Sequence, residues 1–345
     1  MKKNQKHMYV QIMVLLTVVI SIFLTNSARA EPFRIILTHL EPPLVPNSVL
    51  DLADQLGYFE REGVDVELVR VQQTPSALAS ILAGEGEMAN VSVDGLLNLV
   101  VQGTDSLLAV SSPNKSLPFI IASTDELQNI SDIAGRSFGI GRVGSLDHSL
   151  STRVLNNYGI DAESLNFIAL GQPSVRAQAL AAMQIDATTM SIGVWLSIPD
   201  KTRLSVLVPQ DAYYQVAPVV SKVNIVSERV LNERRAEVVG VLTALVKISR
   251  DFEANPHTWA IAMEPYRGNL SLNDMNTLSE SFAGTWSVNG GLNRNELQYT
   301  QDIIMQSEDF PKGKPISLED WVDFSPIDEA LDSLDIITGA DEPIR

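Results

Sequence analysis

The chain of 345 residues contains no cysteine. That absence excludes disulfides, thiolate metal sites, a cysteine nucleophile and a lipid-modified cysteine at a mature N-terminus. Histidine is also scarce, and four residues leave little material for a catalytic triad or a zinc site. The sequence has no H-E-x-x-H, P-loop or G-x-S-x-G motif. We therefore expect a protein that is not an enzyme and that needs neither a metal nor a cofactor.

Basic residues are in deficit, with 25 Lys and Arg against 42 Asp and Glu, for a formal net charge of −17. The first thirty residues hold four cations and no acid, so a chain without them carries −17 − 4 = −21. An acidic surface argues against nucleic acid and anionic lipid as partners. It does not fix the charge of a ligand, because a buried site sets its own local field.

The chain has one long apolar run, at residues 8–24. Three lysines precede this run and Ala28-Arg29-Ala30 follows it, which is the pattern of a secretory signal peptide. The alternative is a membrane anchor, but polar residues interrupt the run and leave it short of the ~20 apolar residues of a spanning helix. We expect cleavage after Ala30 and a mature protein, residues 31–345, that works in the periplasm.

Short apolar segments alternate with helical patterns along the first two thirds of the chain. This alternation predicts an α/β fold, with a mainly parallel sheet that carries helices on its faces. The last third is predicted to be helical from its apolar spacing of three and four residues. The expected strands are 34–38, 64–71, 88–91, 107–110, 137–140, 166–170 and 187–190, and the late helices are 227–252, 275–282, 296–305 and 326–334.

One pattern occurs twice in the chain. Pro75-Ser76 opens a helix that leads to a strand ending at Ser92, and Pro173-Ser174 opens one that leads to Ser191. The offset is 98 residues at the prolines and 99 at the final serines. The repeat predicts two similar α/β lobes.

We assign lobe one to residues 31–115 plus 220–345, and lobe two to residues 116–219. Two crossover segments, at 112–123 and 211–226, would join the lobes and act as hinges. The late helices follow no further strands, so they are expected to pack on lobe one.

Several motifs resemble those of the periplasmic solute-binding proteins of nitrate, sulfonate and taurine ABC transporters, a family that also includes binders of thiamine-precursor pyrimidines. The run from Leu56 to Leu68, LGYFEREGVDVEL, is similar to the family's "GYF…EGLDVEL" signature. The other matches occur in the family's order along nearly the whole mature chain: Ile81–Ala89, Ile130–Ile140, Ala254-Asn255-Pro256 and Trp321–Ile327. The segments Gly84–Glu87 and Met183–Asp186 depart from the family's "AGxxD" pattern, which leaves the subfamily open.

This resemblance implies a type II periplasmic binding protein, with two Rossmann-like lobes, that closes on a small molecule and delivers it to an ABC permease and ATPase. Open parallel sheets bind ligands beyond the carboxyl ends of their strands, where helix N-termini favour anions. By that rule the candidate ligand-binding residues are Thr38, His39, Ser76, Ser92, Asp94, Arg142, Gly144, Ser145, His148, Ser191 and Trp195. Each also has a structural interpretation: the serines and Asp94 as helix caps or first-turn residues, the histidines as structural hydrogen bonders, Arg142 as a solvated surface group and Trp195 as packing.

The ligand itself stays open between classes. We expect a small anion, with sulfonates ahead of nitrate, while Asp94 and Asp147 would suit the amine of a taurine-like zwitterion. A neutral pyrimidine-like heterocycle is the main alternative. The run Gly139–Gly144 matches G-x-G-x-x-G, but export and the lack of a matching acidic residue favour a tight ligand loop over a dinucleotide site. A sensor domain or an enzyme of the same fold are the other functional alternatives to a monomeric importer component.

Overall fold

The computed structural model describes residues 31–115, 118–143, 145–306, 310–338 and 341–345. The predicted signal segment, its cleavage after Ala30 and the candidate residue Gly144 lie outside the described residues. Within these ranges, every helix is too short or too polar to span a bilayer.

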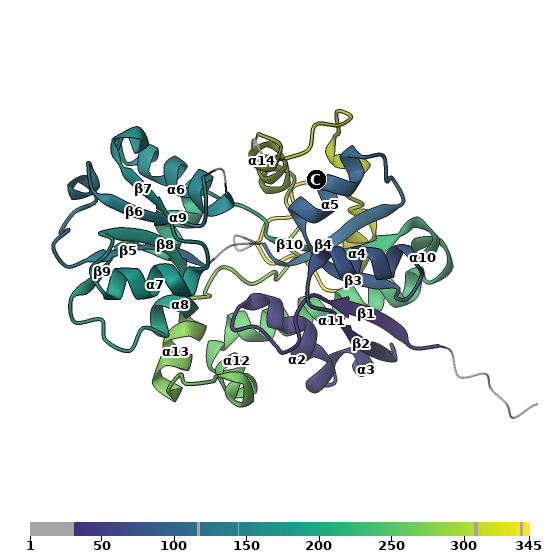
Figure 1. Ribbon diagram of the computed structural model, residues 1–345. Helices are drawn as coiled ribbons and strands as arrows, with labels where there is room; N and C mark the ends of the chain where they lie inside the picture. Colours follow the sequence, from purple (N-terminus) through teal and green to yellow (C-terminus); the bar gives the residue numbers. More distant parts are fainter. Residues whose placement is uncertain (1–30, 116–117, 144, 307–309, 339–340) are drawn as a thin grey trace, which may run out of the picture. The chain divides into compact units, whose positions relative to one another are not determined.

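Two separate five-stranded sheets organise the chain (Figure 1). The first has the order β2-β1-β3-β10-β4 and the second the order β7-β6-β8-β5-β9. Strands of the first sheet are β1 (Phe33–Leu37), β2 (Val66–Arg70), β3 (Met88–Ser92), β4 (Leu107–Asn114) and β10 (Lys222–Ser227). Strands of the second are β5 (Phe119–Thr124), β6 (Ser137–Ile140), β7 (Asn166–Ala169), β8 (Ala187–Ser191) and β9 (Leu204–Val208).

The two sheets follow one plan, as the sequence repeat predicted. In each, three parallel strands are followed by one antiparallel strand, β10 or β5, and then by an outer strand. Because β10 runs in reverse, its first residue, Lys222, pairs with Ser92 at the carboxyl end of β3. In the second sheet Phe119 pairs with Ser191 in the equivalent position. The antiparallel strand therefore adds side chains to the edge where the parallel strands end.

Helices connect the strands and fill the C-terminal third. Proline at the first turn starts α4 and α7, where a missing N–H is tolerated. The helical elements are η1 (Pro46–Ser48), α2 (Val49–Gln55), α3 (Tyr58–Arg61), α4 (Thr74–Leu82), α5 (Val93–Val101), α6 (Leu146–Asn157), α7 (Pro173–Ala181), α8 (Ile192–Leu196), α9 (Gln210–Val216), α10 (Glu228–Glu233), α11 (Arg235–Ala254), α12 (Pro256–Ala262), α13 (Leu272–Glu280), α14 (Arg294–Met305) and α15 (Ser325–Asp332).

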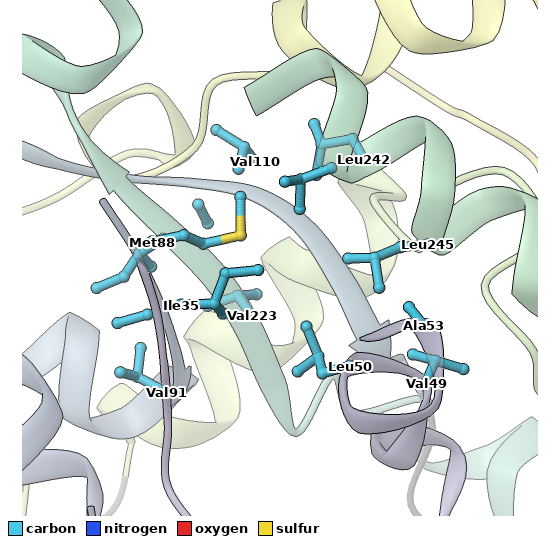
Figure 2. Packing of buried hydrophobic residues seen from close by; sticks show 14 of the residues in the cluster. Ile35, Val49, Leu50, Ala53, Met88, Val91, Val110, Val223, Leu242 and Leu245 are labelled. Carbon is cyan, nitrogen blue, oxygen red and sulfur yellow. The ribbon is translucent and has the colours of Figure 1, made fainter. Parts of the chain in front are cut away.

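Each sheet has its own hydrophobic core. Figure 2 shows Leu50 of α2 and Leu242 of α11 in one cluster with Ile35, Val110 and Val223 of the first sheet. The C-terminal helices belong to this core, and Trp259, Trp286 and Trp321 are buried there as packing residues. Two smaller clusters flank the second sheet. The predicted α/β class and the placement of the late helices on the first sheet are confirmed.

The expected crossover segments were placed too broadly. Most of 112–123 is strand, because β4 continues to Asn114 and β5 begins at Phe119. Likewise 211–226 holds α9 and most of β10. After each crossing the chain enters the antiparallel strand of a sheet, β5 or β10. The apolar pattern of a short segment does not reveal that such a strand lies next to a crossing. The lobe boundaries themselves stay a prediction.

The predicted helix at 227–252 is two helices, α10 and α11, separated at Arg234. Arg234 has a φ of −129°, outside the helical range. Its guanidinium lies 3.3 Å from the Glu87 carboxylate and over the Phe33 ring. These tertiary contacts hold the backbone out of the helix at a position where the apolar spacing continues.

Candidate functional site

A cavity of about 770 Å³ lies where elements of both sheets meet. Its lining from the first sheet comes from the start of α4, the start of α5 and the segment Val219–Ser221 that enters β10. The second sheet contributes Arg142, Ser145 and Leu146, which follow the carboxyl end of β6. We call this the first cavity. It lies at the carboxyl edge of the strands, where ligands bind in open α/β sheets.

A second cavity of about 500 Å³ lies against the second sheet. Its lining includes Ser191 at the end of β8, Phe119 at the start of β5 and Arg176 on α7. Arg142, Ser145 and Leu146 line both cavities, so the loop between β6 and α6 forms their common wall.

Lys222 brings a positive charge to the carboxyl edge of the first sheet. Its Nζ donates a hydrogen bond to Thr38 Oγ1 at 2.6 Å, just beyond the end of β1. Burial lowers the pKa of Lys222, and no acid lies within ion-pair distance of it among the described residues. The Lys222 side chain is half-buried, and neither Lys222 nor Thr38 is among the lining residues of the two cavities.

His39 belongs to a chain of polar contacts, His39–Asp51–Arg70, at the same edge of the first sheet. Its Nε2 lies 2.8 Å from Asp51 Oδ2, and Asp51 Oδ1 lies 2.7 Å from Arg70 Nη2. Asp51 is buried on α2, and its carboxylate contacts the His39 ring with one oxygen and the Arg70 guanidinium with the other. This arrangement fixes the His39 ring beside Thr38 and leaves Nδ1 as the ring nitrogen that does not face Asp51.

The loop between β6 and α6 is tied together by Asp147. Its Oδ2 accepts the Gly141 N–H at 2.8 Å, and its Oδ1 lies 2.7 Å from Ser145 Oγ. A Cβ on Gly141 would lie 2.9 Å from Asp147 Oδ1, which explains the glycine at this position. The carboxylate is thus committed to the loop, so the amine-binding role considered for Asp147 has no support in this geometry.

Arg176 is the buried cation of the second cavity. Its guanidinium donates to the carbonyls of Gly171 at 2.5 Å and Thr189 at 3.2 Å, and lies 3.6 Å from Asp147 Oδ2. Its Nε is buried without a hydrogen-bond partner in the described part of the chain. Asp147 thus balances the charge of Arg176 beside the loop between β6 and α6.

The structure brings part of the predicted set together. Lining the first cavity are Ser92, Asp94, Arg142 and Ser145, and lining the second are Arg142, Ser145 and Ser191. Thr38 and His39 lie at the same edge of the first sheet, held by Lys222 and Asp51. The cap interpretation is confirmed for Ser191, whose Oγ accepts the Val194 N–H.

Five of the predicted residues line neither cavity: Thr38 and His39, which were placed above, and Ser76, His148 and Trp195. Ser76 is exposed in the first turn of α4. His148 packs edge-on against Phe167, with 4.6 Å between ring centroids. Trp195 packs with the cluster beside α7 and has Lys201 Nζ at 6.0 Å from its ring. Tertiary packing turned these side chains away from an edge that they adjoin in sequence.

Lys222 and Arg176 were missed by the sequence argument. That argument collected residues after each parallel strand, whereas Lys222 begins an antiparallel strand and Arg176 lies one turn inside a helix. The signal that would have identified Lys222 is a lysine directly before the mainly apolar segment VNIV, just after a chain crossing. No local signal marks Arg176.

The comparisons with known proteins agree with this geometry. A family model described as NMT1/THI5 like matches residues 49–258. No curated protein matches the chain by sequence.

Solved structures of similar fold include the periplasmic aliphatic sulphonate binding protein SsuA from Escherichia coli, at TM-score 0.65 and 15% identity over 85% of this chain and 92% of that one. The alkanesulfonate-binding protein SsuA from Xanthomonas axonopodis, bound to MOPS, matches at 0.57 and 19% over 81% and 94%. The periplasmic nitrate-binding protein NrtA from Synechocystis matches at 0.62 and 11% over 92% and 93%. These likenesses show a shared fold, that of type II periplasmic binding proteins.

Proposed function

The chain belongs to the NMT1/THI5-like family, and from this premise we propose that it is the periplasmic substrate-binding component of an ABC importer. Its ligand is a small anion held between the two sheets, with an organic sulfonate ahead of nitrate. The solved proteins of the same fold that are named for sulfonate or nitrate binding support this class. The mature protein, residues 31–345, works as a monomer in the periplasm.

The observation that carries the proposal is the first cavity. Both sheets contribute to its wall, the first through α4, α5 and the entry to β10, the second through the loop at Arg142–Leu146. A ligand at such a place contacts both sheets at once, so its binding energy favours the arrangement in which they close on it. That arrangement is the signal a permease and ATPase would read.

Lys222 supports an anion over a neutral heterocycle. A half-buried ammonium that has Thr38 Oγ1 as its hydrogen-bond partner would gain a charge partner when an anion arrives. A neutral pyrimidine would leave this ammonium uncompensated. Ser92 and Ser221 beside it provide hydroxyl and backbone groups that bind anions without adding charge.

The test is binding of an anion panel to the mature protein and to two lysine variants. The panel holds methanesulfonate, taurine, benzenesulfonate, nitrate and bicarbonate, with a pyrimidine as the neutral comparison. Lys222→Met should weaken anion binding by about tenfold to a hundredfold, the value of a hydrogen bond to a charged group. Lys247→Met is the control, because Lys247 lies on α11 and pairs with Glu62, whereas Lys222 pairs across the sheet with Ser92, which lines the first cavity. Isothermal titration calorimetry gives the affinities.

Each outcome has a definite meaning. Loss of anion binding in Lys222→Met alone supports the proposal. Pyrimidine binding that neither variant changes would favour the heterocycle class instead. Silence across the whole panel contradicts an anion-binding function and brings forward the sensor and enzyme alternatives.

A further inference from the structure

We propose that the first cavity holds an apolar body of the ligand, so the imported molecule is an amphiphilic organic anion and not a small inorganic ion. This inference rests on the proposed function, because it assumes that the ligand lies between the two sheets. It adds a subsite for the part of the ligand that carries no charge.

Size is the first argument. The cavity of about 770 Å³ lies in the range of ~300–1,000 Å³ typical of sites for drug-sized ligands. One water molecule accounts for ~30 Å³ of liquid, and nitrate or bicarbonate is only a few times larger. An inorganic anion would leave most of the space to water against apolar walls.

The chemistry of the walls is the second argument. Three helices and the segments beside them direct apolar side chains into the cavity, including Leu78, Leu82, Leu99, Val220, Ile303 and Phe310. Two of its lining residues, Asp94 and Arg142, carry charge. Arg142 and Ser145 belong to the wall shared with the second cavity, and Ser221 adjoins Lys222. The other polar lining residues, Thr74, Ser92, Asn98, Ser145, Ser149 and Ser221, are uncharged, and the apolar surface extends along α4, α5 and α14.

Exposed leucines are the third argument. Leu82 is 50% exposed and Leu146 is 39% exposed, and both line this cavity. They come from different sheets, Leu82 from α4 and Leu146 from α6. Large apolar side chains that stay exposed in one cavity provide surface that the apolar body of a ligand would cover.

The experiment is calorimetry of the mature protein with two homologous series, n-alkanesulfonates and n-alkanecarboxylates from one to eight carbons, plus nitrate and sulfate. Burial of each methylene should strengthen binding by about fourfold until the cavity is filled. The heat-capacity change of binding should become more negative with chain length. Two head groups are used so that the effect of the body is measured apart from the preference for a head.

Leu82→Gln locates the effect. The variant should lower the affinity for octanesulfonate and leave methanesulfonate unchanged. Leu272→Gln is the matched control, because Leu272 is 47% exposed on α13 and lines neither cavity. The partial exposure of both leucines makes these changes compatible with folding.

The outcomes separate this inference from the proposed function. Equal affinity along the series, or tighter binding of nitrate than of octanesulfonate, overturns the apolar subsite and leaves an anion-binding protein. A chain-length effect that Leu82→Gln preserves in full removes the subsite from this cavity. Absence of binding by every anion overturns the proposed function, and the subsite with it.

Discussion

Lys222 is the residue on which the proposed anion preference depends, in a protein whose net charge is negative. The chain carries −17 overall, yet this half-buried ammonium lies at the carboxyl edge of the first sheet, with a hydroxyl as its partner. The net charge of the protein affects how charged molecules approach from a distance, while the local field near Lys222 would affect binding of the proposed anion.

The half-buried position of Lys222 predicts a pH dependence of anion binding. Its pKa lies below the ordinary 10.5, so the charged form is lost at a lower pH than in an exposed lysine. Affinity for an anion should fall as pH rises through that lowered pKa, and binding should be accompanied by proton uptake there. Calorimetry between pH 7 and 10, in buffers of different ionisation enthalpy, measures both. A flat profile that Lys222→Met shares would contradict the assignment.

Glu296 on α14 predicts a second pH effect, in which burial shifts the pKa in the opposite direction. Burial raises its pKa above the ordinary 4.5, although the Tyr214 hydroxyl donates to its Oε1 at 2.8 Å and Lys115 lies nearby. A raised pKa means that the folded state holds the proton more tightly than the unfolded state. The stability from this group is complete below pH 4.5 and is lost as pH rises through the folded pKa.

Glu296→Gln should therefore be more stable than the parent at pH 8, and the difference should vanish near pH 4. Thermal unfolding across this range measures it, with Glu228→Gln, exposed on α10, as the control. A difference that stays constant with pH would show that packing, and not ionisation, controls this position.

At the scale of elements, the antiparallel strands β10 and β5 carry information that the parallel strands do not. Each brings the chain into a sheet after a crossing and places its first residue, Lys222 or Phe119, at the ligand-binding edge. The turn Gly290-Gly291, which precedes α14, contacts β4, because the Ser112 N–H donates to the Gly290 carbonyl. Gly291 has a φ of +72° and its N–H donates to the buried Asp341 carboxylate.

Gly291→Ala should be strongly destabilising. A Cβ there would lie 2.1 Å from the Ser112 carbonyl oxygen, so the backbone of β4 must move. Gly284→Ala is a matched control with a φ of +73° and open space around it. The control should lose about 1–2 kcal/mol from the left-handed backbone alone, and Gly291→Ala about 1–3 kcal/mol more from overpacking. Equal losses in chemical denaturation would refute the steric argument.

At the scale of the whole molecule, each sheet has its own hydrophobic packing, and this division bears on how the protein unfolds with and without a ligand. One hydrophobic cluster serves the first sheet, and two others flank the second. Helix α14 joins them, because Leu297 is buried in the first core while Tyr299 and Ile303 pack against the second. Arg153 of α6 lies 4.5 Å from the Tyr299 ring centroid.

This division predicts two partly separate unfolding transitions in the free protein, because separate cores need not unfold together. A ligand between the sheets should merge the transitions, and at 100 times its dissociation constant it adds about 2.7 kcal/mol. Differential scanning calorimetry with and without ligand is the measurement. One transition in the free protein that satisfies the two-state criterion would contradict the prediction.

The sequence by itself determined the α/β class, the helical C-terminal third and the doubled plan. These follow from apolar periodicity, from proline at helix starts and from a repeat of about a hundred residues, all of which are local or compare one segment with another. It also placed Ser92, Asp94, Arg142 and Ser145 at strand ends that line the cavity, since the end of a parallel strand fixes an edge of its sheet.

Only the tertiary structure decided which side chains face one another at that edge. The antiparallel direction of β10 brings Lys222 to Thr38, although 184 positions separate them. Tertiary packing likewise decided that His148 lies against Phe167 and that Asp147 accepts the Gly141 N–H. Contacts between residues far apart in sequence depend on the order and direction of the strands. That order depends on the packing of both hydrophobic cores, which no short stretch of sequence encodes.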